Sequence, residues 1–116
     1  MSNLNNLNNS NPCLFCKILH QEIPAEIVYE DEHVIAFKDI HPKAPVHLLV
    51  IPKTHIASLL DLSQTHLDLM GKLTLALPKI AQKMGLSQGF KIQINTGIGG
   101  GQEVFHLHYH LMGKAS

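Results

Sequence analysis

The residues best suited to chemistry in this sequence are three histidines, His106, His108 and His110, which alternate with apolar residues. In an extended strand over 106–112, alternate side chains share one face, so the imidazoles would stand about 6.7 Å apart with the apolar side chains opposite. Imidazole is a poor strand former and titrates near neutral pH, so a row of three indicates function rather than packing. Two functions fit: a metal site built from alternate residues, or a nucleophilic histidine flanked by helpers.

The two cysteines of the chain, Cys13 and Cys16, are separated by two residues. This spacing fits half of a zinc site, a redox dithiol, or two small apolar residues. Reducing conditions disfavour a structural disulfide, and the βαβ context of a thioredoxin-like motif is missing. Zinc would need two more ligands, which histidines elsewhere could supply.

Composition limits the classes of function. The chain has 116 residues, 45% of them hydrophobic, which predicts one domain with a single core. Nine Lys and Arg balance nine Asp and Glu, so no basic field recruits nucleic acid or a membrane, and a nucleotide ligand must be held by local geometry. The apolar runs are too short to span a bilayer and the N-terminus lacks a signal pattern, so we expect a cytoplasmic protein.

The histidines need a folded frame, which the hydrophobic pattern outlines. Residues 1–11 hold six asparagines and predict a disordered tail, followed by a single domain over 12–116. Pro78 should kink or split the long helix near Ala76. The predicted elements are a short helix over 12–20, strands over 26–30, 34–38, 46–51, 90–95 and 106–112, and a long helix over 63–84.

A glycine-rich loop over 96–102 precedes the histidines. It lacks the lysine of a P-loop and is not followed by a helix, so it is neither a Walker motif nor a Rossmann motif. Alone it fits a plain hairpin loop as well as a turn whose amides approach an anion.

Taken in order along residues 12–113, these motifs resemble the histidine-triad (HIT) nucleotide-binding family. The resemblance implies an α+β fold with a five-stranded antiparallel sheet, one long and one short helix, and a homodimer in which two sheets join. The motifs that carry it are Cys13-Leu-Phe-Cys-Lys-Ile, Glu22-Ile-Pro-Ala, Phe37-Lys-Asp-Ile-His-Pro, Pro45-Val-His-Leu-Leu-Val-Ile-Pro-Lys-Thr-His55, Asn95-Thr-Gly, Gly100-Gly-Gln and the histidine run itself.

The resemblance assigns roles to individual residues. His108 matches the family's nucleophile, which attacks the α-phosphate of a nucleotide conjugate and forms a nucleotidyl-histidine that water hydrolyses. His110 and Asn95 match groups that contact the phosphate. The implied substrate-binding residues are Phe15, Ile18, Ile23, Phe37 and Ile40 around the base, Asp39 at the ribose, and Gly101, Gln102 and Glu103 near the phosphate and leaving group.

The resemblance also bears on the metal. Family members with paired cysteines are similar to galactose-1-phosphate uridylyltransferases, whose structural zinc uses two cysteines and two histidines. The matching residues here are Cys13, Cys16, His55 and His106, a ligand set that suits a closed tetrahedral zinc site. The alternative is a pair of buried thiols with His106 as an orienting group and His47 as a neighbour. No organic cofactor is expected.

The favoured function is hydrolysis of purine nucleoside 5′-phosphoramidates, as AMP or GMP conjugates, or of related nucleotide conjugates. The alternatives are a nucleotide-binding or interaction module with little turnover, and a diadenosine polyphosphate hydrolase. Glu103 stands where well-studied phosphoramidases of the family carry a serine, and the chain stops at Ser116 without the extension that shapes substrate choice in several relatives. The sequence does not identify the leaving group.

Overall fold

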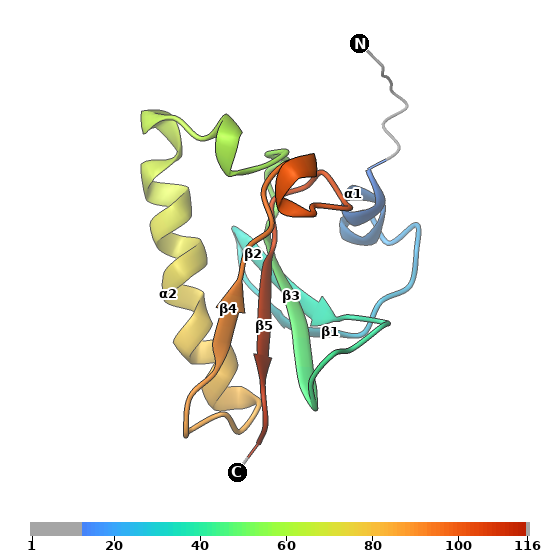
Figure 1. Cartoon of the computed structure of the whole chain (residues 1–116), viewed down its shortest axis with the longest axis vertical. Coiled ribbons are helices and arrows are strands. Elements are labelled where there is room, and N and C mark those ends of the chain that lie inside the picture. The colour runs from blue at the N-terminus through green and yellow to red at the C-terminus, as the bar shows by residue number, and fades with distance from the viewer. Residues whose placement is uncertain (1–12, 116) are drawn as a thin grey trace.

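One antiparallel sheet forms the centre of the molecule (Figure 1). The structure, a computed structural model, describes residues 13–115, so the asparagine-rich segment 1–11 lies outside the described residues. The sheet has five strands in the order β1-β2-β3-β5-β4, which confirms the expected α+β class. The helices are α1 (Leu14–Leu19) and α2 (Leu67–Lys83), the strands are β1 (Ile27–Glu30), β2 (Val34–Lys38), β3 (Val46–Pro52), β4 (Lys91–Gln93) and β5 (Tyr109–Gly113), and three 3-10 turns lie at Leu59–Asp61, Gln64–His66 and Ile98–Gly100.

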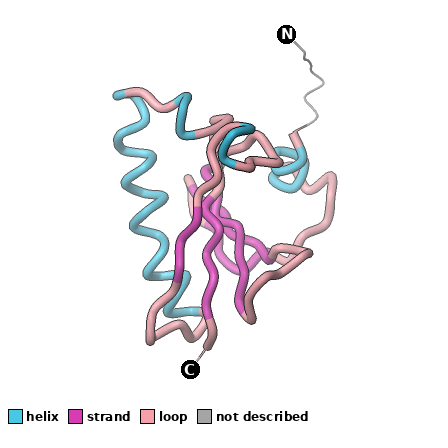
Figure 2. The backbone as a smooth tube through the Cα atoms, viewed as in Figure 1, coloured by secondary structure: helices cyan, strands magenta, loops and turns pink. Residues whose placement is uncertain are grey.

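The strands β2 and β3 are buried on both faces, which explains why their sequences are almost continuously apolar. Alternate side chains enter two separate clusters. Val34 and Ala36 of β2 pack in the cluster that includes α2, whereas Ile35 and Phe37 pack in the cluster that includes α1. The helix α2 runs along one face of the sheet (Figure 2), which leaves the opposite face open to form a site near α1.

The helix α2 continues through Pro78, so the expected split near Ala76 is wrong. Proline removes one backbone hydrogen bond and disfavours helix at the preceding residue. Packing on both sides of Pro78 offsets this cost, because Leu73 and Ile80 are both fully buried in the same cluster. The tertiary contacts of the helix therefore override its local break signal.

The start of α2 also differs from the prediction. The sequence predicts a helix from Ser63, but Gln64–His66 forms a 3-10 turn and the α-helix begins at Leu67. Ser63 still marks the boundary, since it forms a reciprocal capping box with His66.

The strand β5 is shorter than the predicted strand over 106–112. Its pairing with β3 begins at Val50 opposite Tyr109, and β3 ends at Pro52, which has no N–H to continue the ladder. The Leu107 amide instead donates to the carbonyl of Ile56. Two of the three histidines thus precede the regular strand.

The strand β4 is likewise limited to Lys91–Gln93, within the predicted 90–95. Among residues 13–115, no helix combines the length and apolar character needed to cross a membrane.

Candidate active site and metal cluster

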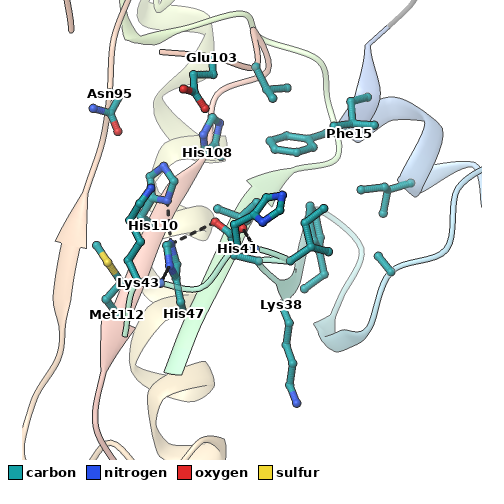
Figure 3. A pocket seen from close by; sticks show the side chains of 18 of the residues that line it. Phe15, Lys38, His41, Lys43, His47, Asn95, Glu103, His108, His110 and Met112 are labelled. Carbon is teal, nitrogen blue, oxygen red and sulfur yellow. Dashed lines mark hydrogen bonds and ion pairs between the residues drawn. The ribbon is translucent and has the colours of Figure 1, made fainter. Parts of the chain in front are cut away.

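A cavity of about 690 Å³ lies against the sheet beside α1 (Figure 3). It has an apolar end near α1 and a polar end near β4 and β5. Of the residues that the sequence assigned to catalysis or substrate binding, the structure brings together here Phe15, Ile18, Ile23, Phe37, Asp39, Ile40, Asn95, Gly101, Glu103, His108 and His110. Gln102 is not among the lining residues.

The apolar end of the cavity is rigid because its side chains belong to the core. The rings of Phe15 and Phe37 meet edge to face with centroids 5.4 Å apart. Phe15 also meets His108 edge to face at 5.0 Å, so one ring joins the apolar end to the catalytic candidate. Ile40 is 84% exposed and stands at the rim. A flat apolar group such as a nucleobase fits this end.

His108 is held in one tautomer by the backbone. Its Nδ1 lies 2.7 Å from the carbonyl oxygen of His106, and a carbonyl can only accept, so Nδ1 carries the proton. The lone pair is therefore on Nε2, the nitrogen left for the cavity. Burial lowers the pKa of His108, which keeps the imidazole neutral near pH 7. A buried, neutral imidazole with a free Nε2 lone pair is equipped for nucleophilic attack.

A second chain of hydrogen bonds orients His110. The backbone N–H of Lys43 donates to His47 Nδ1 at 3.0 Å, so the proton of His47 is on Nε2. That Nε2 lies 3.0 Å from His110 Nδ1 and 3.3 Å from a carboxylate oxygen of Asp39. His110 Nδ1 is thus an acceptor, and its Nε2–H remains as a donor for a ligand in the cavity.

The same network argues against a metal ion at Asp39, His47 and His110, although their ligand atoms lie within 4.8 Å of one another. A neutral histidine that binds a metal through Nε2 carries its proton on Nδ1. At His47 that proton would oppose the N–H of Lys43. Instead, the proton on His47 Nε2 is shared between His110 Nδ1 and the Asp39 carboxylate.

The sequence suggested His47 only as a neighbour of His106, whereas the structure places it beside His110 and Asp39. It lies on β3, buried, 63 positions from its partner His110. The available signal was a lone histidine inside the apolar strand 46–51, where a buried imidazole requires a partner.

Gln102 stabilises the glycine-rich loop rather than lining the cavity. Its side-chain oxygen accepts from the N–H of Gly97 at 2.8 Å, and its amide nitrogen donates to the carbonyls of Ala57 and Val104 at 2.7 and 3.0 Å. Asn95 performs a related task, because its amide donates to Gly100 O at 2.8 Å. The side chain of Asn95 also lines the cavity.

A separate cluster joins α1 to the segment before β5. Cys13 Sγ lies 3.4 Å from His106 Nδ1, and Cys16 Sγ lies 3.3 Å from His55 Nδ1 and 3.6 Å from His106 Nδ1. All four ligand atoms lie within 4.8 Å of one another. The structure therefore assembles the complete predicted metal set from three distant parts of the chain.

The geometry of this cluster fits zinc. Zn–S and Zn–N bonds of about 2.3 and 2.0–2.1 Å at tetrahedral angles place sulfur and nitrogen ligands about 3.6 Å apart, close to the separations here. His106 Nε2 donates to the carbonyl of Pro52 at 2.8 Å, so its Nδ1 lone pair faces the sulfurs. A histidine ligand oriented by a carbonyl on its other nitrogen is the usual arrangement around bound zinc.

Burial and hydrogen bonding set the pKa values of the two cysteines far apart. Burial raises the pKa of Cys13, but hydrogen bonds to His106 and His55 outweigh it and lower the pKa to about 5. Burial and the neighbouring Cys13 raise the pKa of Cys16 to about 12. Hydrogen bonding to Cys13 also raises the pKa of His55. Binding of zinc would require both thiolates and neutral imidazoles, and so would release protons.

Three alternating histidines, two buried and one half-buried, at and just before β5 of a five-stranded antiparallel sheet with one long helix define a histidine-triad protein. A family model described as scavenger mRNA decapping enzyme C-term binding matches residues 12–116, and the chain belongs to the histidine-triad family.

Relatives and solved structures agree with this assignment. The chain is 58% identical over 101 residues to Protein HitA of Neisseria gonorrhoeae, covering 87% of this chain and 94% of HitA. It is 44% identical over 101 residues to the purine nucleoside phosphoramidase of Escherichia coli, covering 86% and 85%. It is 42% identical over 104 residues to a 14 kDa zinc-binding protein of Zea mays, covering 88% and 81%. A HIT family hydrolase from Legionella pneumophila superimposes with a TM-score of 0.85 at 47% identity, covering 90% and 94%.

Proposed function

We propose that this protein hydrolyses purine nucleoside 5′-phosphoramidates or related nucleotide conjugates through a nucleotidyl-histidine on His108. The observation that carries the proposal is the 2.7 Å hydrogen bond from His108 Nδ1 to the His106 carbonyl, which leaves the Nε2 lone pair for the cavity. Support comes from the similarity to a purine nucleoside phosphoramidase and to a HIT family hydrolase.

The two ends of the cavity suit the two parts of a nucleotide. A purine would lie between apolar side chains such as Phe15 and Phe37, and the α-phosphate would lie at His108. Asp39, 18% exposed at its side chain, would accept the ribose hydroxyls from a position already fixed by the N–H of His41 at 2.9 Å. The apolar end of the cavity, and not the histidines, would therefore bind the base.

The proposed hydrolysis has two steps, which use the tautomers of His108 and His110. His108 Nε2 attacks the α-phosphorus, the bond to the leaving group breaks, and the leaving group departs with the electron pair and takes up a proton from solvent. The His110 Nε2–H would donate to a phosphoryl oxygen as charge develops there. Water then attacks the phosphorus and the electron pair returns to His108. Turnover of an adenosine 5′-phosphoramidate, with isolation of adenylylated enzyme after acid quench, tests this function.

The role of His110 predicts a specific loss. His110→Ala should lower kcat/KM by about 30- to 1,000-fold, which corresponds to about 2–4 kcal/mol of lost transition-state stabilisation. One preorganised donor disappears in this variant while the nucleophile stays. Steady-state kinetics on the same phosphoramidate measures the loss. A variant with kcat/KM equal to wild type would remove His110 from the mechanism.

We also infer that the Cys13, Cys16, His55 and His106 cluster holds a structural zinc, supported by the ligand geometry and by the similarity to a zinc-binding protein. The ion would supply no chemistry to the substrate, because these four ligands complete a tetrahedral site. It would connect α1, which carries Phe15, to the backbone that orients His108.

We expect the protein to form a homodimer in which two sheets join. Leu67 and Leu75 on α2 are 66% and 69% exposed, and β4 is an edge strand of the sheet within the described residues. Sedimentation at micromolar concentration should give the mass of two chains, and Leu75→Glu should shift it toward one. Leu60→Glu, at a leucine 80% exposed in a 3-10 turn, is the matched control. A wild-type monomer would contradict the expectation.

A further inference from the structure

Glu103 is a carboxylate at the cavity that the steps above leave without a task. Its side chain lines the cavity from the loop before β5, and Figure 3 shows the carboxylate directed toward His108. Within residues 13–115, no hydrogen-bond donor or cation is paired with it. The residues on either side are anchored, because the Gln102 side chain is buried and donates to the carbonyl of Val104. The loop therefore holds a free acceptor over the nucleophile.

The other carboxylate of the cavity, Asp39, already has protein partners and is assigned to the ribose in the proposed function. One oxygen of Asp39 accepts from the N–H of His41 at 2.9 Å, and the other lies 3.3 Å from His47 Nε2. His108 cannot accept a proton at Nδ1, which faces the His106 carbonyl, or at Nε2 while that atom is bonded to phosphorus. Glu103 is thus the cavity carboxylate available to take a proton.

The two proposed steps differ in their demand for protons. In the first step the leaving group must gain a proton, and an ionised carboxylate has none to give. In the second step the attacking water must lose a proton, and an ionised carboxylate within hydrogen-bond reach of that water is a suitable general base. The chemistry of Glu103 matches the second step.

We propose that Glu103 is the general base of the hydrolytic step, an inference that rests on the proposed function. Water forms a bond to phosphorus, its proton passes to the Glu103 carboxylate, and the P–Nε2 bond breaks. The electron pair of that bond returns to His108 Nε2, which restores the neutral imidazole with its proton still on Nδ1. The proton on Glu103 then passes to solvent.

The test separates the two steps with Glu103→Gln, using the full chain and an adenosine 5′-phosphoramidate whose amine becomes fluorescent on release. The burst of amine should keep the wild-type rate, because the first step does not use the carboxylate. The steady rate after the burst should fall by about 100-fold or more, and intact-mass measurement should show adenylylated enzyme accumulating. Glu103→Ala should behave alike and regain part of the steady rate in added formate.

Matched controls exclude a general effect of charge or folding. Glu32→Gln removes a carboxylate at the β1–β2 turn, outside the cavity, and should leave both phases unchanged. Glu103→Asp keeps the carboxylate and should retain more of the steady rate than Glu103→Gln.

Several results would overturn the inference. One is a steady rate for Glu103→Gln within about threefold of wild type with no adenylylated enzyme. Another is a burst slowed as much as the steady rate, which would place Glu103 in substrate binding or in the first step. If wild type itself neither turns over nor becomes adenylylated, the proposed function fails and the role of Glu103 fails with it.

Discussion

Replacing His108 with alanine is expected to reduce turnover of a nucleoside phosphoramidate by about 10⁴-fold or more, because the substitution removes the proposed attacking nitrogen. Nucleotide binding should persist, since the apolar end of the cavity is built from core side chains such as Phe37 and Leu49. The adenylylated enzyme seen after acid quench of wild type should be absent. Steady-state kinetics, equilibrium binding of AMP and intact-mass measurement check these three results.

The control is His33→Ala, a histidine at the β1–β2 turn whose side chain is 37% exposed and lies outside the cavity. Its turnover should match wild type. A His108→Ala variant that retains activity within about tenfold of wild type would refute the nucleophile assignment. If the variant loses both AMP binding and turnover, His108 instead supports the shape of the cavity.

Removal of the proposed zinc is expected to have the largest effect on stability. Zinc would connect α1 through Cys13 and Cys16 to His55 and to His106, which lies 93 positions from Cys13. A ligand that binds only the folded state stabilises it by about 4 kcal/mol at a thousandfold excess over Kd, so a chelator should lower the melting temperature by more than about 10 °C. Differential scanning calorimetry with and without chelator measures the change.

Metal loss should also reduce activity, since His106 has two connections. Its ring would bind zinc while its carbonyl orients the His108 ring. Displacement of this segment would free His108 Nδ1 from its acceptor, and the nucleophile would lose its single tautomer. The fall in kcat/KM should therefore follow zinc content during titration with chelator.

Elemental analysis of reduced protein purified without a histidine tag decides whether the site exists. Wild type should contain close to one zinc per chain, and Cys13→Ser should lose most of it. His20→Ala, at an exposed histidine on the end of α1, should retain the metal. Zinc near zero in wild type would reject the site, and full occupancy in Cys13→Ser would reject this ligand set.

Much of the fold was predictable because it depends on local alternation of apolar and polar residues. In β2, Val34 and Ala36 enter one cluster and Ile35 and Phe37 the other, as the period of a strand requires. The split that the sequence predicted at Pro78 does not occur, because the packing of Leu73 and Ile80 outweighs the local preference of proline against helix. The helix propensity of a segment depends only on its own residues, whereas the burial of its side chains depends on contacts with strands that are distant in the sequence.

The sequence alone determined which residue types could serve as nucleophile, donor and ligand, since that depends only on side-chain chemistry. It did not determine which histidines share a site, because His106 and His108 precede the regular strand, and His106 joins the cysteines whereas His108 and His110 line the cavity. The tertiary structure decided where the protons lie. His108 takes its tautomer from a carbonyl, and His110 takes its own through His47 from the backbone N–H of Lys43. The tertiary structure also decided that the Gln102 side chain stabilises the glycine-rich loop and does not line the cavity. Such choices depend on hydrogen-bond partners brought together across many residues, which spacing along the chain does not encode.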